Sequence, residues 1–328
     1  MNIVVTGGTG FIGRRLIARL IARGDRVVCF SRKPGQVADC ECRSVDYALP
    51  SLAIDDDAFD GVDVVFHLAG ATRAPTADRF QEANTGATIR LVDRILRAGA
   101  KPRFVFVSSL AAAGPTPADA TPNAAGVPMR VEADADHPIE PYGASKLAAE
   151  RSIAERELPW TIVRPCAVYG PGDRDFLTIF QMARRGVAVF PGNRDSFIST
   201  IFVDDLVDGM LRAAGPEGVG KTFFLSHDEA LSFRDIYRTI ATGMGRQLRF
   251  ELSVPAALIH LVAPLGDVAG LVTGRPPLLN RSKAAMATAP FWTCSADRAR
   301  QELGFVAATS LRDGVARTYS WYVQNQLL

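Results

Sequence analysis

A glycine-rich turn near the start of the chain limits its fold more than any other feature. Gly7, Gly10 and Gly13 are spaced three residues apart, directly after an apolar run at residues 3–5. Residues 14–23 then carry apolar side chains at the spacing of one helical face, and residues 27–30 form a second apolar run. The pattern predicts a strand, a tight turn, a helix and a second strand.

A turn of this kind suits a phosphate ligand. Glycines let the backbone come close to a pyrophosphate, and the N-terminus of the helix offers unpaired amides and a partial positive charge. We expect a dinucleotide to lie over this turn, bound by Gly7, Gly10, Phe11, Ile12 and Gly13. An ordinary structural turn is the alternative, because glycine is common in turns of every kind.

The end of the second predicted strand indicates which dinucleotide binds. Ser31 stands where a carboxylate would hold the ribose hydroxyl of NAD, and Arg32 and Lys33 come directly after it. Two cations suit the 2′-phosphate of NADP, so NADP is the expected cofactor and NAD the alternative. A solvated loop end is the other interpretation of the same two side chains.

Composition excludes several classes of protein. The 328 residues carry 37 Lys and Arg against 35 Asp and Glu, a net charge of +2, with no basic block. A small-molecule substrate is therefore expected, and a nucleic-acid partner is not. Four separated His and five scattered Cys residues argue against a zinc or other metal cluster and for reduced thiols. No signal sequence precedes the first strand, so we expect a cytoplasmic protein.

The longest apolar stretch, at residues 255–272, is interrupted by His260, Pro264, Gly266 and Asp267. It falls short of the roughly 20 uninterrupted apolar residues that span a bilayer. We expect a buried helix or a wall of the substrate pocket, with an interfacial helix as the alternative.

Strand-like and helix-like segments alternate through the first half of the chain. Apolar runs at residues 62–68, 104–107 and 161–163 accompany a helical pattern over residues 85–98. The alternation predicts an α/β fold, a doubly wound parallel sheet with helices on both faces, known as the Rossmann fold.

The expected domain boundary lies near residue 165. Residues 1–165 would form the dinucleotide-binding domain, and residues 166–328 mainly a smaller, mostly helical domain that binds substrate. Strands near residues 198–204 and 222–225 are candidates for a return to the first domain. Residues 111–141, rich in Pro, Ala, Asp and Gly, predict a long loop that serves as a lid or as part of the substrate site.

A second motif, Pro-Tyr-Gly-Ala-Ser-Lys at residues 141–146, indicates proton transfer. Tyr142 and Lys146 are four residues apart, which places them about one turn apart on the same face of a helix. A tyrosine normally titrates near a pH of roughly 10, and neighbouring positive charge lowers the pKa of the phenol. We therefore expect Lys146, together with a nicotinamide ring, to lower the pKa of Tyr142.

Together the two motifs resemble the extended branch of the short-chain dehydrogenase/reductase superfamily, the NAD(P)-dependent epimerase/dehydratase type. Its glycine turn has the spacing seen at residues 7–13, and its catalytic Ser or Thr lies five residues before a glycine, which matches Ser109 and Gly114. The resemblance implies that Ser109 hydrogen-bonds the substrate oxygen, Tyr142 moves the proton, and Lys146 tunes Tyr142 and holds the nicotinamide ribose. Hydroxyl groups that cap a strand end are the alternative.

The same resemblance assigns further residues to the cofactor. Asp46, at the end of a third short strand, would bind the adenine amino group, with a plain surface aspartate as the alternative. Asn84 would fix the strand behind the cofactor, and helix capping is an equally physical role for it. The other implied contacts are Leu68 and Ala69 of a His-x-Ala-Gly signature and Pro165 and Val168 of the crossover beside the nicotinamide.

Three departures from the sugar-nucleotide enzymes of this superfamily concern the substrate. Ala167 replaces the Asn by which epimerases hold their substrate, and Ile198 replaces an Arg that binds diphosphate. Leu110 and Ala111 replace the Asp-Glu pair that dehydratases need to eliminate water. The C-terminal part of the chain instead resembles the hydroxysteroid dehydrogenase and dihydroflavonol reductase-like subgroup.

The expected function is an NADP-dependent oxidoreductase that interconverts a secondary alcohol and a ketone by hydride transfer. A nucleotide-sugar epimerase with a tightly bound, recycled cofactor is the alternative, and a catalytically silent NADP-binding sensor is the third interpretation. Relatives often dimerise through helices beside the sheet, so a homodimer is one expectation.

Overall fold

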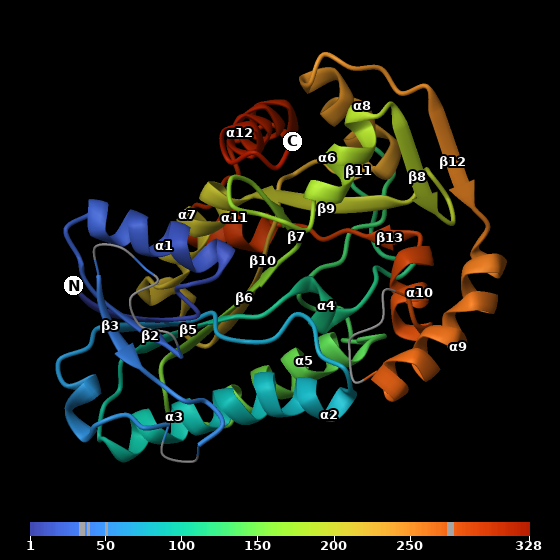
Figure 1. The fold of residues 1–328 in the computed structure, drawn as a ribbon. Coiled ribbons are helices and arrows are strands. Elements are labelled where there is room, and N and C mark those ends of the chain that lie inside the picture. Colours follow the sequence, from blue (N-terminus) through green and yellow to red (C-terminus); the bar gives the residue numbers. More distant parts are fainter. Residues whose placement is uncertain (33–36, 38–39, 50–51, 274–278) are drawn as a thin grey trace.

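A parallel β-sheet forms the centre of the molecule (Figure 1). The computed structural model describes residues 1–32, 37, 40–49, 52–273 and 279–328. Within them, seven parallel strands pair in the order β10-β6-β5-β4-β1-β2-β3. The strands are β1 (Asn2–Thr6), β2 (Arg26–Ser31), β3 (Glu41–Ser44), β4 (Val64–His67), β5 (Arg103–Val107), β6 (Trp160–Pro165) and β10 (Lys221–Leu225). The strand order reverses between β1 and β4, and such sheets bind ligands at the carboxyl ends of the strands beside this reversal.

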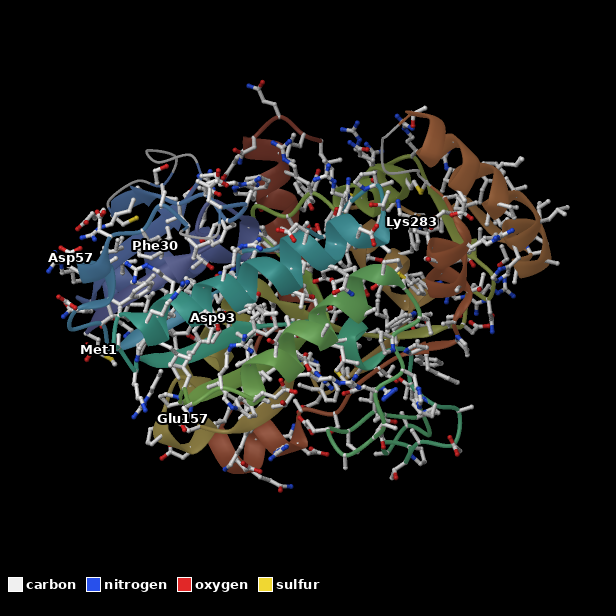
Figure 2. The ribbon with its side chains drawn as sticks, turned by 90° about the horizontal axis from the view of Figure 1, so that it is seen from below. Met1, Phe30, Asp57, Asp93, Glu157 and Lys283 are labelled. Carbon is white, nitrogen blue, oxygen red and sulfur yellow. The ribbon has the colours of Figure 1, made fainter. Side chains whose placement is uncertain are left out.

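Helices cover both faces of this sheet, because side chains alternate between the faces along each strand. On β1, Ile3 and Val5 pack in one apolar cluster and Val4 packs in the other. The first face is covered by α1 (Phe11–Ala22), α7 (Val203–Ala213) and α11 (Asp297–Leu303). The opposite face is covered by α3 (Ala87–Arg97) and α5 (Pro141–Ala154), which Figure 2 shows from below with Asp93 on α3. The predicted doubly wound parallel sheet is confirmed.

Much of the second half of the chain lies beside the large sheet and contains small sheets as well as helices (Figure 1). One small sheet consists of β7 (Ala167–Tyr169), β9 (Phe197–Phe202), β11 (Ala230–Ser232) and β13 (Phe291–Trp292), and a parallel pair consists of β8 (Val187–Pro191) and β12 (Phe250–Val254). The helices are α6 (Leu177–Arg184), α8 (Phe233–Gly243), α9 (Ala256–Thr273), α10 (Arg281–Thr288) and α12 (Leu311–Gln324). Short elements elsewhere are η1 (Asp56–Phe59), α2 (Ala77–Phe80), the π-helical η2 (Gln81–Gly86), α4 (Leu110–Ala113) and η3 (Pro216–Gly218).

Two predicted strands lie elsewhere than expected. The third strand, β3, ends at Ser44, so Asp46 lies two residues beyond it. Strand β9, which covers most of residues 198–204, pairs with β7, β11 and β13 and not with the large sheet. Residues 222–225 belong to β10, which does join the large sheet beside β6.

The long segment at residues 111–141 begins with α4 and is tied to neighbouring elements. Thr116 Oγ1 donates a hydrogen bond to the carbonyl of Thr293 (2.7 Å), and Glu132 accepts one from the amide of Phe224 (2.8 Å). The Arg130 side chain is buried and donates to the carbonyl of Ala135 (2.9 Å). These contacts fix the segment against β10 and β13.

Residues 255–272 are largely contained in α9, and the expectation of a buried helix is wrong for much of its described surface. Ile259 and Ala263 are buried, but Leu258, Leu261 and Leu265 are exposed. None of the helices that the structure describes has the length and hydropathy needed to cross a bilayer.

Candidate active site

The glycine turn closes tightly against the end of β4. Gly7 has φ +71°, and a Cβ atom added to it would lie 2.7 Å from the amide nitrogen of Ala69. A Cβ atom added to Gly13 would lie 2.3 Å from the Gly7 carbonyl oxygen, and the Gly10 amide donates to that same oxygen at 3.0 Å. Gly7 and Gly13 therefore accept no larger residue without a backbone shift.

The turn fits the pyrophosphate of a dinucleotide. Gly10 is the N-cap of α1, which has neither a capping side chain nor an acidic residue in its first turn. The first amides of α1 therefore remain available to an anion, and the helix dipole favours negative charge there. Phe11 and Ile12 in this first turn are half-buried, and the Phe11 ring lies beside Gly172 after β7.

A buried chain of hydrogen bonds runs from this turn to the helix on the far side of β4. Thr6 Oγ1 accepts from the Ala69 amide (3.1 Å) and bonds His67 Nδ1 (2.6 Å). His67 Nε2 bonds Thr88 Oγ1 (2.9 Å), and Thr88 donates in turn to the carbonyl of Asn84 (2.6 Å). Because Thr88 uses its proton for that carbonyl, the His67 ring carries its proton on Nε2 and accepts from Thr6 on Nδ1.

Asn84 joins this chain to the predicted catalytic helix. Its side-chain amide accepts from the Ala71 amide (2.7 Å), donates to the Ala71 carbonyl (3.1 Å) and donates to Ser145 Oγ (2.9 Å). Asn84 lies in the π-helical segment η2, and such segments are frequent at functional sites. The loop after β4 and helix α5 are thus held by one buried side chain. The simple helix-capping role does not apply, since Asn84 lies inside η2.

Ser109 lies close enough to Tyr142 to lower the pKa of its phenol, although the two are 33 positions apart in the chain. Ser109 is the N-cap of α4 and accepts from the Ala111 amide (3.1 Å), while Tyr142 lies in the first turn of α5. The two helices approach closely at Gly143, where an added Cβ atom would lie 2.1 Å from the Ala111 carbonyl oxygen. Glu140 caps α5 by accepting from the amides of Tyr142 and Gly143. Ser109 therefore has the capping role given as the alternative, and its hydrogen bond to a substrate oxygen stays a prediction.

Burial controls the acidity of the Tyr142 phenol. It raises the pKa of Tyr142 to about 12, while a hydrogen bond with Ser109 lowers the pKa and the Glu140 charge raises it. The direction is opposite to the one expected from the sequence. The Lys146 ammonium donates instead to the Val107 carbonyl (2.7 Å) and lies over the Phe106 ring, 4.5 Å from its centroid.

Lys146 itself is almost completely buried. Burial lowers the pKa of its ammonium group to about 8, and the Glu150 charge acts in the opposite direction. An ammonium group has three protons, and the Val107 carbonyl takes one of them. Among the residues that the structure describes, Lys146 has no second hydrogen-bond acceptor, so its other protons can bind hydroxyl groups of a ligand.

A buried ionic network behind this site was not predicted. Glu150, one turn beyond Lys146, accepts from the Ser108 hydroxyl and from Arg164 at the end of β6. Arg164 also forms two bonds with Asp136 (2.8 and 2.9 Å), so it connects β6, α5 and the segment before α5. The only sequence signal was the Arg-Pro start of the crossover. Ser108, the residue before Ser109, thus has a structural role.

The remaining predicted cofactor residues lie around the carboxyl ends of the strands. Ser31 is buried at the end of β2, Arg32 is exposed directly after it, and Lys33 lies outside the described residues. Asp46 is exposed and accepts from the Ala48 amide (3.0 Å), as an aspartate in a turn does. The predicted cofactor residues Leu68 and Ala69 come directly after β4. Pro165 is the last residue of β6, and Val168 lies in β7.

The chain is similar to known proteins over almost its whole length. The family model described as "NAD dependent epimerase/dehydratase family" matches residues 3–223. A ceramide reductase from Caulobacter vibrioides is 28% identical over 324 residues, which cover 98% of this chain and 94% of the relative. A UDP-glucose 4-epimerase from Mycolicibacterium smegmatis is 28% identical over 350 residues, with 98% of both chains covered. The solved structure of MoeE5 in complex with UDP-glucose and NAD is 25% identical, has a TM-score of 0.75, and is covered over 100% of its length by 99% of this chain.

The buried His67 ring predicts a pH-dependent stability. Burial, and secondarily the Lys146 charge, lower the pKa of His67 to about 3, below the value of roughly 6.5 expected in the unfolded chain. The unfolded chain therefore binds a proton that the folded protein does not. The neutral ring therefore contributes to the free energy of unfolding, fully above pH ~6.5 and less and less as the pH falls toward ~3. Between pH 7 and pH 5 the free energy of unfolding should fall by about 2 kcal/mol from this group.

Urea unfolding at pH 7 and pH 5 checks this effect in wild type and His67→Asn. The stability advantage of wild type should shrink by about 2 kcal/mol at the lower pH, because the variant lacks the titrating group. Phe104→Leu is the control, because it changes a buried side chain next to the His67 ring and involves no titratable group. It should lower the free energy of unfolding by the same amount at both pH values. Equal pH dependence in wild type and His67→Asn would show that the ring does not stay neutral.

Proposed function

The chain belongs to the NAD dependent epimerase/dehydratase family, and we propose that it is an NADP-dependent oxidoreductase that interconverts a secondary alcohol and a ketone on an apolar substrate. The family and the Rossmann fold make it an NAD(P)-dependent enzyme. The observation that supports the specific proposal most strongly is the close approach of α4 and α5 at Gly143, which places Ser109 near the Tyr142 phenol, four residues ahead of Lys146.

Ser109 and Tyr142 would share the substrate oxygen. Ser109 Oγ accepts from the Ala111 amide, and its one proton lies toward the Tyr142 phenol. When a ketone binds, this proton would turn to the carbonyl oxygen. Because burial raises the pKa of Tyr142, the phenol is protonated at neutral pH and can give its proton to that oxygen as the carbonyl is reduced. In the opposite direction the phenolate would take the proton of the alcohol.

The nicotinamide cofactor, when bound, supplies or accepts the hydride. The amides of residues 11–13 would bind its pyrophosphate beside Gly10, and the remaining protons of Lys146 would bind the nicotinamide ribose. Asn84 would be a positioning residue, because it holds the loop after β4 against α5. The other cofactor contacts that we propose are Gly7, Ser31, Arg32, Lys33, Asp46, Leu68, Ala69, Tyr142, Pro165 and Val168.

The residues at the end of β2 favour NADP as the cofactor. Ser31 ends the strand without a carboxylate, and the Arg32 side chain beside it is exposed. A guanidinium group can bind a phosphate through two parallel hydrogen bonds. The 2′-phosphate of NADP offers that partner and the 2′-hydroxyl of NAD does not.

An apolar substrate is proposed from the residues that replace the usual sugar-nucleotide contacts. Ala167 in β7 and Ile198 in β9 have side chains without a hydrogen-bond donor, and both are half-buried. Leu110 and Ala111 after Ser109 offer no acid or base for elimination. The similarity to a ceramide reductase points the same way.

A nucleotide-sugar epimerase is the second candidate. It is favoured by the similarity to a UDP-glucose 4-epimerase and by the MoeE5 complex with UDP-glucose and NAD. An epimerase would convert a UDP-sugar without net consumption of NADPH, and UDP would raise its melting temperature. Strict dependence of turnover on a UDP- or dTDP-sugar would establish this candidate and reject the first.

Tyr142→Phe should lower kcat for NADPH-dependent ketone reduction by about 10²–10⁴-fold, because it removes the proton donor and leaves the ring in place. Continuous assays with a panel of long-chain and alicyclic ketones, followed at the NADPH absorbance, measure this. NADPH affinity should change little. Tyr319→Phe on α12 is the matched control and should retain wild-type activity. Full activity in Tyr142→Phe would reject the proposed chemistry.

Arg32→Ala should weaken NADPH binding by about ten- to a hundredfold, since a charge-assisted bond of about 1.5–3 kcal/mol is lost. NADH binding should stay within about twofold. Titration of nucleotide fluorescence gives both constants. Arg26→Ala, an exposed arginine at the start of the same strand, should affect neither. Equal losses for both dinucleotides would contradict the assigned phosphate contact.

A further inference from the structure

Exposed apolar side chains are concentrated on one part of the molecule, away from the glycine turn. Among the residues that the structure describes, six of the thirteen exposed large apolar side chains lie between positions 250 and 265. Leu261 and Leu265 on α9 are 75% and 70% exposed, and Phe250 on β12 is 69% exposed. We call this the β12–α9 surface, and it consists of Phe250, Leu252, Leu258, Leu261, Val262 and Leu265. A large exposed apolar surface of this kind marks an interaction site.

The four α9 residues occupy one face of the helix. Positions 258, 261, 262 and 265 follow the i, i+3, i+4, i+7 spacing of a single helical stripe. The adjoining face, with Ile259 and Ala263, is already packed on Ala284 of α10. At Gly266 an added Cβ atom would lie 1.6 Å from the carbonyl oxygen of Leu279, so α9 is held closely against that segment. The leucine stripe therefore cannot turn inward without breaking this packing.

The strand β12 extends the same surface. Phe250 and Leu252 share a strand face with Val254, because side chains alternate along a strand. Val254 packs against the cluster that contains Ile259 of α9. The exposed part of the strand is thus continuous with the helix that comes after it.

Positive charge gathers on the elements beside this surface. Residues 184–195 and 234–251, which include β8 and part of β12, contain seven Arg against three Asp and Glu, whereas the whole chain has a net charge of only +2. The amides of Arg249 and Phe250 both donate to the carbonyl of Gly186 (2.7 and 3.1 Å), which brings Arg249 beside Arg185. In the described part of the chain, Arg184, Arg185, Arg246 and Arg249 form no ion pair.

We propose that the β12–α9 surface binds an anionic phospholipid bilayer. The apolar side chains would enter the boundary between headgroups and acyl chains, and the neighbouring arginines would contact lipid phosphates. An 18-residue helix that carries Pro264 and is packed along one side on α10 lies on a bilayer and does not span it. This inference rests on the surface alone and holds whichever reaction the active site catalyses.

A second copy of the chain fits the surface less well. A two-fold contact places the same surface against itself, and the six residues of that surface carry no acidic side chain to neutralise the unpaired arginines beside it. Anionic headgroups supply the missing negative charge.

Sedimentation of the full-length protein with vesicles tests the proposal. The protein should bind vesicles of mixed phosphatidylcholine and phosphatidylglycerol, bind pure phosphatidylcholine weakly, and lose affinity as salt is added. Leu261→Asp/Leu265→Asp should lower the partition coefficient at least about tenfold, because the apolar contact is lost. Arg184→Gln/Arg185→Gln should lower binding to the anionic vesicles by about fivefold for each arginine.

Val219→Asp/Val306→Asp is the matched control, since it makes the same kind of change at two exposed valines on other surfaces. Its vesicle binding should equal that of wild type. Circular dichroism and the melting temperature show that each variant is folded. Absence of vesicle binding by wild type, or unchanged binding by Leu261→Asp/Leu265→Asp, overturns the proposal. A dimer in sedimentation equilibrium that dissociates in Leu261→Asp/Leu265→Asp also overturns it, because the surface then belongs to a second copy.

Discussion

The side-chain amide of Asn84 holds together the two parts on which the candidate site depends. It bonds the backbone after β4 on one side and Ser145 of α5 on the other, and the backbone carbonyl of Asn84 accepts the proton of Thr88. Through His67 and Thr6 the same chain of bonds reaches the end of β1, where the glycine turn begins. The side chains of Thr6, His67, Asn84 and Thr88 are all buried. Removing one of them would leave an unpaired buried polar group and lower the free energy of unfolding by about 1–3 kcal/mol. The turn that fits a dinucleotide and the helix that carries Tyr142 are therefore positioned by one network.

Low exposure also determines the charge state of the groups around this network. Burial lowers the pKa of His67 and of Lys146 and raises the pKa of Tyr142, in each case favouring the neutral form. His67 is thereby a fixed, neutral connector. The Tyr142 phenol keeps its proton at neutral pH, which suits the proposed carbonyl reduction, and added positive charge at the site would move it toward phenolate. Behind the site, the buried charge of Arg164 is compensated by Glu150 and Asp136.

Short-range patterns in the sequence predicted most of the fold around the site. Glycine spacing and the strand–turn–helix order predicted the sheet and the turn, and the four-residue interval between Tyr142 and Lys146 predicted their common helix. Long-range pairing was less accessible: β9 has an ordinary strand pattern, and nothing in residues 197–202 says which sheet it joins. The bonds of His67 and the Glu150–Arg164 pair join distant segments, so only the folded chain reveals them. For α9, periodicity identified an apolar helix but not that its leucine stripe remains uncovered.

A crystal structure of the protein with NADPH tests the central claim most directly, namely that two distant hydroxyl groups and the glycine turn form one site. The account predicts the pyrophosphate at the amides of residues 11–13. It also predicts the hydroxyl groups of Ser109 and Tyr142 facing the nicotinamide ring, with space for a substrate carbon about 3–3.5 Å from the ring. A nicotinamide ring bound away from Ser109 and Tyr142, or a dinucleotide bound elsewhere on the chain, would contradict the account.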